Sequence, residues 1–562
     1  MHYFTSFLLI IQIFFSPFVV SSPLPSIDSQ SVYAIYTLSY NDTQSTIIYI
    51  NIQFPTNENT LLPLNRTLTF IMPRSIPSGY NLQMYDSYVE NLTARSLNGN
   101  PIIVEKESTD SPRWIVKCSS SEILSTISYA IDLAKQEKDI LSAGDASKIR
   151  RDRYIGILGY SVYGYLEQMD RVENFPIEII VYGPSEWPIH LTLPSSDTLT
   201  NEQVYGMTSG RAKNYYHLAD SQVYMGPNIN IKYISIPLNQ FYRKKSKSYT
   251  NTSLSFYVVL YTEDSYNLDF DLLVGLSFEA MENLLVYYNS TPFLRYTVGV
   301  EMLKPLGEQY SYSFSMEHLN SCTISIDYGS GVNINSTKTR LRTFQYNIAH
   351  HIQHAWLPKR LFSKFYYPYT FEVTPVIDTI WFNEGFGQYI AMDAMANVLP
   401  LNESYDYRQY FIENRFKFYF NLAPLFIKEM SLDYLSMIGS TLYSVDFRTG
   451  SYLFASGALM AQEIDEFIQL NTQKQKSIRD VIIYMMKWSE SNEYISPFTM
   501  KQFPKFFMDA TNVDVNSILD KWLEPNYCHD MPSISSKSLF SCVPAIAVIF
   551  CCMFFHIVGN FL

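Results

Sequence analysis

The 562-residue chain has no run of basic residues and no internal repeat. Its 41 Lys and Arg residues are outnumbered by 53 Asp and Glu residues, which gives a formal net charge of −12 at pH 7. Nucleic-acid binding needs a concentrated basic face that contacts phosphates, so the composition argues against nucleic acid as a partner. A chain of this length is too long for one ordinary core, and we expect two or three domains.

Cysteine is also scarce. Three of the six cysteines lie near the C-terminal end, at positions 542, 551 and 552. The other three, Cys118, Cys322 and Cys528, are an odd number, so they form at most one disulfide bond, and the sequence does not say between which pair.

Both ends of the chain lack charge. The largely apolar run Phe7–Val20, followed by small residues, is typical of a secretory signal peptide spanning residues 1–21, although no Lys or Arg precedes it. Residues 538–562 contain no Asp, Glu, Lys or Arg and are long enough to cross a bilayer. No basic cluster follows them, and small residues lie just upstream (Ser533, Ser535 and Ser536), which favours a GPI-anchor signal over a transmembrane segment.

Between these ends lie seven Asn-x-Ser/Thr sequons, which support a secretory route and glycosylation. They begin at Asn41, Asn65, Asn91, Asn251, Asn289, Asn335 and Asn402. We therefore expect a membrane-anchored glycoprotein on the extracellular surface.

Apolar residues recur with a period near two in residues 31–54, 67–72 and 175–182, which predicts strands. We expect a β-sandwich-like N-terminal domain over residues 28–200, with one helical insertion near residues 122–141. Strands and helices mix over residues 215–400, and helical periodicity dominates over residues 401–530. The expected fold class is therefore α+β multidomain. Helices are expected at residues 340–356, 379–398, 457–470 and 477–488.

Two histidines one helical turn apart carry the chemistry of the chain. Positions i and i+4 of a helix share one face, so His350 and His354 can both present imidazole nitrogens to one metal ion. A carboxylate from a second helix, Glu384, would complete three ligands with one open position, the arrangement of catalytic zinc.

The glutamate that should follow the first histidine is missing. In the HExxH pattern this glutamate accepts a proton from the attacking water, and here the position is His351. An imidazole can accept a proton near neutral pH, or it can become an additional ligand that closes the open position. Both interpretations remain open.

Five ordered segments resemble the glycyl-aminopeptidase-like zinc metallopeptidases of the gluzincin clan. Two are the histidine segment, which continues through Trp356 and Lys359-Arg360, and the segment Trp381-Phe382-x-Glu384-Gly385-Phe386-x-x-Tyr389. The other three are similar to the Asp-Ser-Pro, Gly-Gly-Leu-Glu-His and Tyr-x-Lys-Gly-Ala-Leu motifs of that family. They lie at residues 219–226, 315–321 and 454–459.

This resemblance implies a β-rich N-terminal domain, a thermolysin-like catalytic domain and a helical C-terminal domain. It also implies zinc held by His350, His354 and Glu384, and a glutamate, Glu317, that recognises the free amino terminus of a peptide. A solvated carboxylate at the end of a strand is the alternative for Glu317. The Lys359-Arg360 pair either supports the site, binds a carboxylate or is a surface charge pair.

The chain departs from the family at a second position. Phe454 replaces the tyrosine that donates a hydrogen bond to the developing oxyanion, and the lysine position is Ser456. Losing one such donor typically costs about 10²–10³-fold in rate. Tyr452 is nearby, but a shift of two residues turns it to another face of the helix.

Three functions are therefore compatible with the sequence. The leading hypothesis is a secreted, surface-anchored metallopeptidase homologue that binds zinc and peptide amino termini but hydrolyses poorly. The alternative is an active zinc aminopeptidase in which His351 or a displaced carboxylate acts as the base. A third interpretation has no metal, with His351 and its neighbours filling the pocket.

Overall fold

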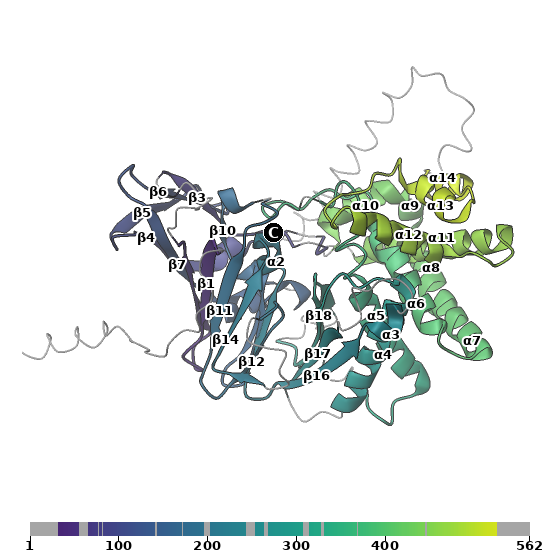
Figure 1. The fold of residues 1–562 in the computed structure, drawn as a ribbon, viewed down its shortest axis with the longest axis horizontal. Coiled ribbons are helices and arrows are strands. Elements are labelled where there is room, and N and C mark those ends of the chain that lie inside the picture. The colour runs from purple at the N-terminus through teal and green to yellow at the C-terminus, as the bar shows by residue number, and fades with distance from the viewer. Residues whose placement is uncertain are drawn as a thin grey trace, which may run out of the picture.

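The computed structural model describes residues 32–524 with internal gaps at 56–63, 65, 77, 81, 141–142, 171, 196–202, 243–252, 264–267, 307–313, 328–330, 368 and 444–446. Strands dominate the N-terminal half and helices the C-terminal half, and Figure 1 shows them on opposite sides of the molecule. The expected α+β multidomain fold is confirmed. The predicted signal peptide and anchor signal lie outside the described residues.

The larger N-terminal sheet has ten strands. They are β1 (Ala34–Ser39), β2 (Ile47–Gln53), β3 (Leu68–Ile71), β4 (Val89–Ser96), β5 (Pro101–Lys106), β6 (Arg113–Lys117), β7 (Leu124–Asp132), β10 (Tyr165–Leu166), β11 (Ile177–Tyr182) and β14 (Met207–Ala212). Their order is β10-β3-β6-β5-β4-β7-β2-β1-β11-β14. Alternating burial along β1 and β2 reflects the period of two in the sequence.

A second sheet packs against the first. It contains β8 (Lys148–Arg150), β9 (Tyr154–Leu158), β12 (Pro188–Leu191), β13 (Val204–Tyr205) and β15 (Gln222–Met225). Residues of both sheets, among them Tyr36, Ile50, Ile155 and Val223, share one buried core, which gives the sandwich-like arrangement.

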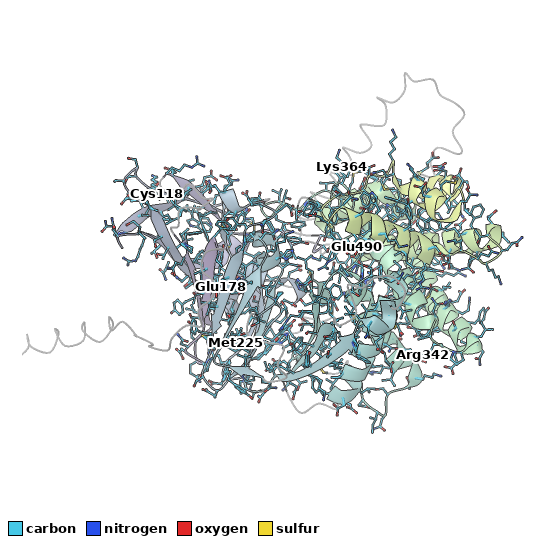
Figure 2. All side chains as sticks on the ribbon, viewed as in Figure 1. Cys118, Glu178, Met225, Arg342, Lys364 and Glu490 are labelled. Carbon is cyan, nitrogen blue, oxygen red and sulfur yellow. The ribbon has the colours of Figure 1, made fainter. Side chains whose placement is uncertain are left out.

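Two details of this region differ from the sequence-based expectation. Residues 124–132 form strand β7, so the expected helical insertion is reduced to the short helix α1 (Leu133–Asp139). The β-branched and aromatic residues of β7 pair with β2 and β4, and this pairing outweighs the helical pattern. The sheets also continue past residue 200, because β14 pairs with β11 and β15 pairs with β9. Met225 at the end of β15 lies among the N-terminal strands in Figure 2.

A third, mixed sheet supports the central part of the chain. Its strands are β16 (Asn230–Pro237), β17 (Ser253–Thr262), β18 (Arg295–Leu303), β20 (Ser321–Asp327) and β19 (Phe314–Glu317), in that order. β17, β18 and β20 run parallel, whereas β16 and β19 are antiparallel edge strands. Helices α4 (Phe270–Tyr288) and α5 (Lys338–Gln353) share a buried core with this sheet.

Further helices form the C-terminal side. They are the π-helical segments η8 (Trp381–Phe386) and η9 (Ile412–Phe416), and α6 (Gly387–Ala396), α7 (Leu401–Phe411), α8 (Lys417–Leu422), α9 (Leu425–Lys428), α10 (Leu432–Leu442), α11 (Phe447–Asn471), α12 (Ile478–Ser491), α13 (Phe503–Thr511) and α14 (Asn516–Leu523). The four expected helices correspond to α5, to η8 with α6, to α11 and to α12. In the described part of the chain, no helix is both long and apolar enough to span a bilayer.

Cys118 and Cys322 are both buried and unpaired. Cys118 lies at the outer end of the ten-stranded sheet (Figure 2), whereas Cys322 is on β20 of the third sheet. Cys528 lies outside the described residues. A disulfide bond between the first two is therefore excluded.

Candidate metal centre

The C-terminal end of helix α5 places the imidazoles of His350 and His354 next to each other. Thr337 caps its start by accepting a hydrogen bond from the backbone N–H of Arg340, and the apolar face buries Ile348 and Ile352 against the core. His350 lies in the last turn, and His354 is the first residue after the helix. Both side chains are buried, so any ion between them would be shielded from solvent.

The π-helical segment η8 delivers the carboxylate. Gly385, directly after Glu384, packs so closely on α11 that a Cβ there would lie 2.4 Å from Cα of Gly457. A Cβ on Gly457 would in turn lie 2.0 Å from the carbonyl oxygen of Trp381. Two glycines therefore allow backbone-on-backbone contact, which fixes where Glu384 lies. Such π-helical segments are frequent at functional sites.

The three donor atoms form a nearly equilateral triangle. Nε2 of His350 lies 3.3 Å from Nε2 of His354, and each of these nitrogens lies 3.4 Å from Oε2 of Glu384. A tetrahedral zinc ion bonded at about 2.0–2.1 Å holds neighbouring nitrogen and oxygen ligands about 3.3–3.4 Å apart. The residues present therefore fit a zinc ion.

Neighbouring groups orient two of the ligands. Nδ1 of His354 lies 2.8 Å from the carbonyl oxygen of Leu357, which assigns the proton to Nδ1 and leaves Nε2 free to bind a metal. The Tyr80 hydroxyl donates to Oε1 of Glu384 at 3.2 Å. Tyr80 reaches the centre from the N-terminal region, where Arg74 pairs with Asp86 at 2.6 Å and donates its backbone N–H to the carbonyl oxygen of Phe371.

The protonation of His354 and that of Glu384 depend on each other. Burial lowers the pKa of His354, but Glu384 and Glu317 outweigh it and raise the pKa to about 9. Burial raises the pKa of Glu384, and His354 and His350 reverse this and lower it. Burial lowers the pKa of His350 to about 4. In the absence of metal, His354 and Glu384 thus form an ion pair, and a metal would replace the His354 proton.

His351 occupies the base position without a carboxylate's properties. Its ring centroid lies 4.9 Å from that of His350 and 6.0 Å from that of His354, and the side chain lines the cleft. Burial lowers its pKa well below the ordinary value, which weakens it as a proton acceptor. One ring nitrogen can nevertheless approach the same point as His350 and His354, because ligand atoms of all three lie within 4.8 Å of one another.

Glu317 comes closer to the ligands than the sequence indicated. One of its carboxylate oxygens lies within 4.8 Å of donor atoms of both His354 and Glu384. The side chain is buried, Oε1 has no hydrogen-bond partner among the described residues, and burial raises the pKa. Glu317 is therefore not a solvated strand-end carboxylate.

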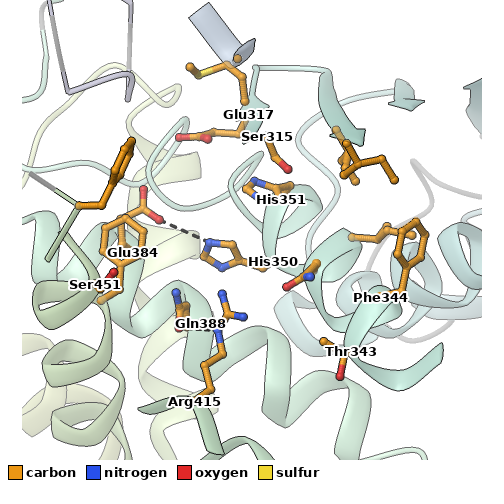
Figure 3. A pocket seen from close by; sticks show the side chains of 18 of the residues that line it. Ser315, Glu317, Thr343, Phe344, His350, His351, Glu384, Gln388, Arg415 and Ser451 are labelled. Carbon is orange, nitrogen blue, oxygen red and sulfur yellow. Dashed lines mark hydrogen bonds and ion pairs between the residues drawn. The ribbon is translucent and has the colours of Figure 1, made fainter. Parts of the chain in front are cut away.

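Glu317, His350, His351 and Glu384 line a cleft of about 980 Å³, to which all three parts of the chain contribute (Figure 3). Phe454 lies on its wall as expected, and its ring stacks on that of Tyr443, with centroids 5.5 Å apart and an interplanar angle of 11°. Tyr443 also lines the cleft, and its pKa is raised by burial and by nearby Glu384 and Glu317. Tyr452 instead stacks on Phe420, with ring centroids 5.4 Å apart.

Lys359 and Arg360 are buried, so they are not a surface charge pair. Nζ of Lys359 lies 3.4 Å from Oδ1 of Asp220, a buried carboxylate that also receives hydrogen bonds from Tyr160 and from the backbone N–H of Leu319. Arg360 donates to the carbonyl oxygens of Leu319 and Ala355 at 2.7 Å. The pair thus holds the end of the histidine segment against the strand that carries Glu317.

The sequence predicted His350, His354 and Glu384 as metal ligands, and the structure brings them together. It did not point to three further residues that line the cleft, Tyr80, Tyr443 and Arg415. Each lies in a segment without a recognised motif. Two weak signals exist: Tyr80 follows a Pro-Ser-Gly turn sequence, and Arg415 lies among the aromatic residues of α7 and α8.

Known proteins resemble this chain in part of its sequence and in its fold. Residues 35–227 match the family model of the Peptidase M61 N-terminal domain. The match supports a metallopeptidase relationship. No curated protein sequence matches the chain.

Solved structures show the same fold. An aminopeptidase N family protein from Idiomarina loihiensis is similar over 90% of this chain and 78% of its own, with a TM-score of 0.70 and 16% identity. Aminopeptidase A of Legionella pneumophila, solved in complex with aspartic acid, is similar over 90% of this chain and 50% of its own, with a TM-score of 0.52 and 13% identity. The fold of the chain is therefore that of the aminopeptidases.

Proposed function

We propose that this protein is a zinc-binding metallopeptidase homologue with impaired or lost peptidase activity, which retains the ability to bind peptide amino termini. The carrying observation is the triangle of His350, His354 and Glu384 beside a base position filled by His351. The glycyl-aminopeptidase resemblance and the M61 match support the family assignment. Bound zinc would act as a Lewis acid that polarises a ligand carbonyl.

The residues of the chain itself would bind and orient the ligand. Glu317 lies beside the ligands with an unpartnered carboxylate oxygen, suited to an ammonium group. The Tyr80 hydroxyl donates to the Glu384 carboxylate. Tyr443 and Phe454 both line the cleft, and of these two only Tyr443 has a hydroxyl group. What the site lacks is a carboxylate at position 351 that accepts a proton.

A second candidate, an active zinc aminopeptidase, is favoured by one observation. The Glu317 carboxylate is close enough to His354 and Glu384 to serve as a displaced proton acceptor. It would then be occupied in proton transfer rather than in binding an amine.

The test is zinc content and turnover of the purified protein. Elemental analysis should give about one zinc per chain, and Glu384→Ala should lose it. With aminoacyl arylamides, the wild-type protein should show little or no hydrolysis above a metal-free control. Turnover at rates typical of enzymes, abolished by Glu317→Gln, would establish the second candidate, and absence of zinc would support the interpretation without metal.

We also propose entry into the secretory pathway and attachment to the cell surface through a GPI anchor. The support is the apolar ends of the sequence and its sequons, of which Asn41, Asn91, Asn335 and Asn402 are exposed. Release of the protein from intact cells by a phosphatidylinositol-specific phospholipase would be expected, and retention after treatment would favour a transmembrane segment.

A further inference from the structure

Arg415 is a cation inside the cleft that the proposed function does not use. It lies in the π-helical segment η9, and its Nε donates to Oε1 of Gln388 at 3.4 Å. Its guanidinium lies over the ring of Tyr346, with Cζ 5.2 Å from the centroid. Figure 3 shows the group pointing from below toward His350 and Gln388. The arginine is thus held in place by neutral groups.

No carboxylate of the described chain lies within ion-pair distance of Arg415. Neighbouring arginines differ in this respect, since Arg342 pairs with Glu403 at 2.5 Å and Arg408 with Asp393 at 2.7 Å. The charge nevertheless lies in the same cleft as His350 and Glu384, and Figure 3 shows it directed toward His350. Arg415 is half-buried, and a guanidinium that faces a cleft and has no carboxylate partner among the described residues can bind an anion there.

Arg415 and Glu317 lie on opposite sides of the ligands. Figure 3 shows Glu317 above the pair formed by His350 and Glu384, and Arg415 below it. The Glu317 side suits an ammonium group, and the Arg415 side suits a carboxylate, which a guanidinium can bind through two parallel hydrogen bonds. The family resemblance accounts for the first of these charges but not for the second.

We propose that Arg415 is a specificity-determining residue that binds a carboxylate, so that the cleft takes short peptides with an ammonium group at one end and a carboxylate on the far side of the metal centre. This inference rests on the proposed function, because Glu317 and the metal would hold the rest of the ligand. The carboxylate has two possible sources, the C-terminus of a dipeptide or an acidic side chain at the second residue.

The experiment measures binding of three peptides to the zinc-loaded protein by isothermal titration calorimetry. Ala-Ala presents a terminal carboxylate, Ala-Ala amide presents none, and Ala-Glu amide presents one only on the side chain. The wild-type protein should bind at least one carboxylate peptide about tenfold more tightly than Ala-Ala amide. Which of the two binds identifies the source. Any peptide that is hydrolysed is compared through kcat/KM instead.

Arg415→Met should reduce the ratio of carboxylate to amide binding to about one while leaving Ala-Ala amide binding and zinc content unchanged. A purely structural role would weaken all three peptides together. Arg415→Lys keeps the charge and should retain part of the preference. Arg340→Met is the matched control, because Arg340 lines the same cleft but donates to the carbonyl oxygen of Gly331 at 2.7 Å; it should leave the ratio within about threefold.

Equal binding of the three peptides by the wild-type protein, or a preference that persists in Arg415→Met, would overturn this assignment and leave the zinc proposal intact. If the purified wild-type protein contains no zinc and does not bind it when zinc is added, the proposed function itself is wrong. Absence of binding of every peptide to zinc-loaded protein would overturn the role of Arg415 and of the cleft as a peptide site together.

Discussion

Two groups of residues at the cleft differ. His350, His354 and Glu384 are buried and have the donor spacing of a metal site. At the positions where the family resemblance implies a proton acceptor and an oxyanion donor, the chain has His351 and Phe454 instead. The difference implies that the spacing needed to hold a metal can be kept while the groups that would act on a substrate are replaced.

The difference between the two groups is tested most directly by restoring the glutamate at position 351. His351→Glu should raise aminoacyl-arylamide turnover by about 10²–10⁴-fold, because it restores a positioned proton acceptor. The measurement is kcat/KM at equal zinc content. His351→Gln, which is similar in size but cannot accept the proton, is the control and should stay inactive. An equal gain in both variants would show that the imidazole merely blocked the cleft.

The support of the histidine segment can be broken at Lys359. Lys359→Met removes the lysine that pairs with the buried Asp220 carboxylate and should lower the free energy of unfolding by about 3–5 kcal/mol at pH 7. Denaturant unfolding followed by circular dichroism measures this. Asp220→Asn with Lys359→Met, which removes both charges, should recover part of the loss.

Acidification should change the size of this effect. Burial raises the pKa of Asp220, but Lys359 and His318 outweigh it and lower the pKa to about 2. In the wild-type protein the contribution of this carboxylate is therefore present above its unfolded pKa, about 3.9, and is lost as pH falls toward 2. Without Lys359, the pKa of Asp220 should be higher than in the wild type, because burial raises it and one of the groups that lower it is gone. The difference between wild type and Lys359→Met should therefore shrink between pH 7 and pH 4, and a constant difference would contradict this explanation.

The Tyr443 hydroxyl, next to Phe454, provides a second test of the comparison. We expect Tyr443, stacked on Phe454, to supply the donor that Phe454 lacks. In a His351→Glu background, Tyr443→Phe should lower kcat by about 10²–10³-fold, the usual cost of losing one oxyanion donor. Phe454→Tyr in the same background is the matched comparison and should change kcat less than Tyr443→Phe does. The opposite order would assign the missing donor to position 454.

The smallest expected effect concerns the orientation of a ligand. Tyr80→Phe removes the hydroxyl that donates to Oε1 of Glu384 and should weaken zinc affinity by about 10–100-fold. Competition with a chromophoric chelator measures the affinity. Tyr366→Phe, which removes a nearby hydroxyl bonded to Ser78, is the control and should have little effect on zinc.

Much of this architecture follows from local sequence pattern. The strand period predicted β1, β2, β3 and β11, and the helical period predicted α5, α11 and α12, because these elements bury one regular face. The i, i+4 spacing places His350 and His354 together for the same reason. Strand β7 was not predicted, since its pairing partners on β2 lie up to 85 residues away in the chain, as for Ile47 and Asp132.

The remainder of the site depends on contacts between distant segments. Tyr80 meets Glu384 across 304 residues, and Lys359 meets Asp220 across 139. Neither contact leaves a periodic trace in the sequence. Arg415 and Tyr443 lie in helical segments whose apolar periodicity predicts which face is buried but not which residues line the cleft. The charge of Arg415 is informative only once its surroundings are known, because a lone arginine in a helix is ordinarily solvent-exposed.

The contact of Gly385 with Gly457 means that α11, which carries none of the three candidate donors, helps to set the position of Glu384. A methyl group added at position 457 would collide with the carbonyl of Trp381 and move the turn that carries this carboxylate. The size of an ion that the three donors could accept would therefore depend on a backbone contact made by the residue next to Glu384.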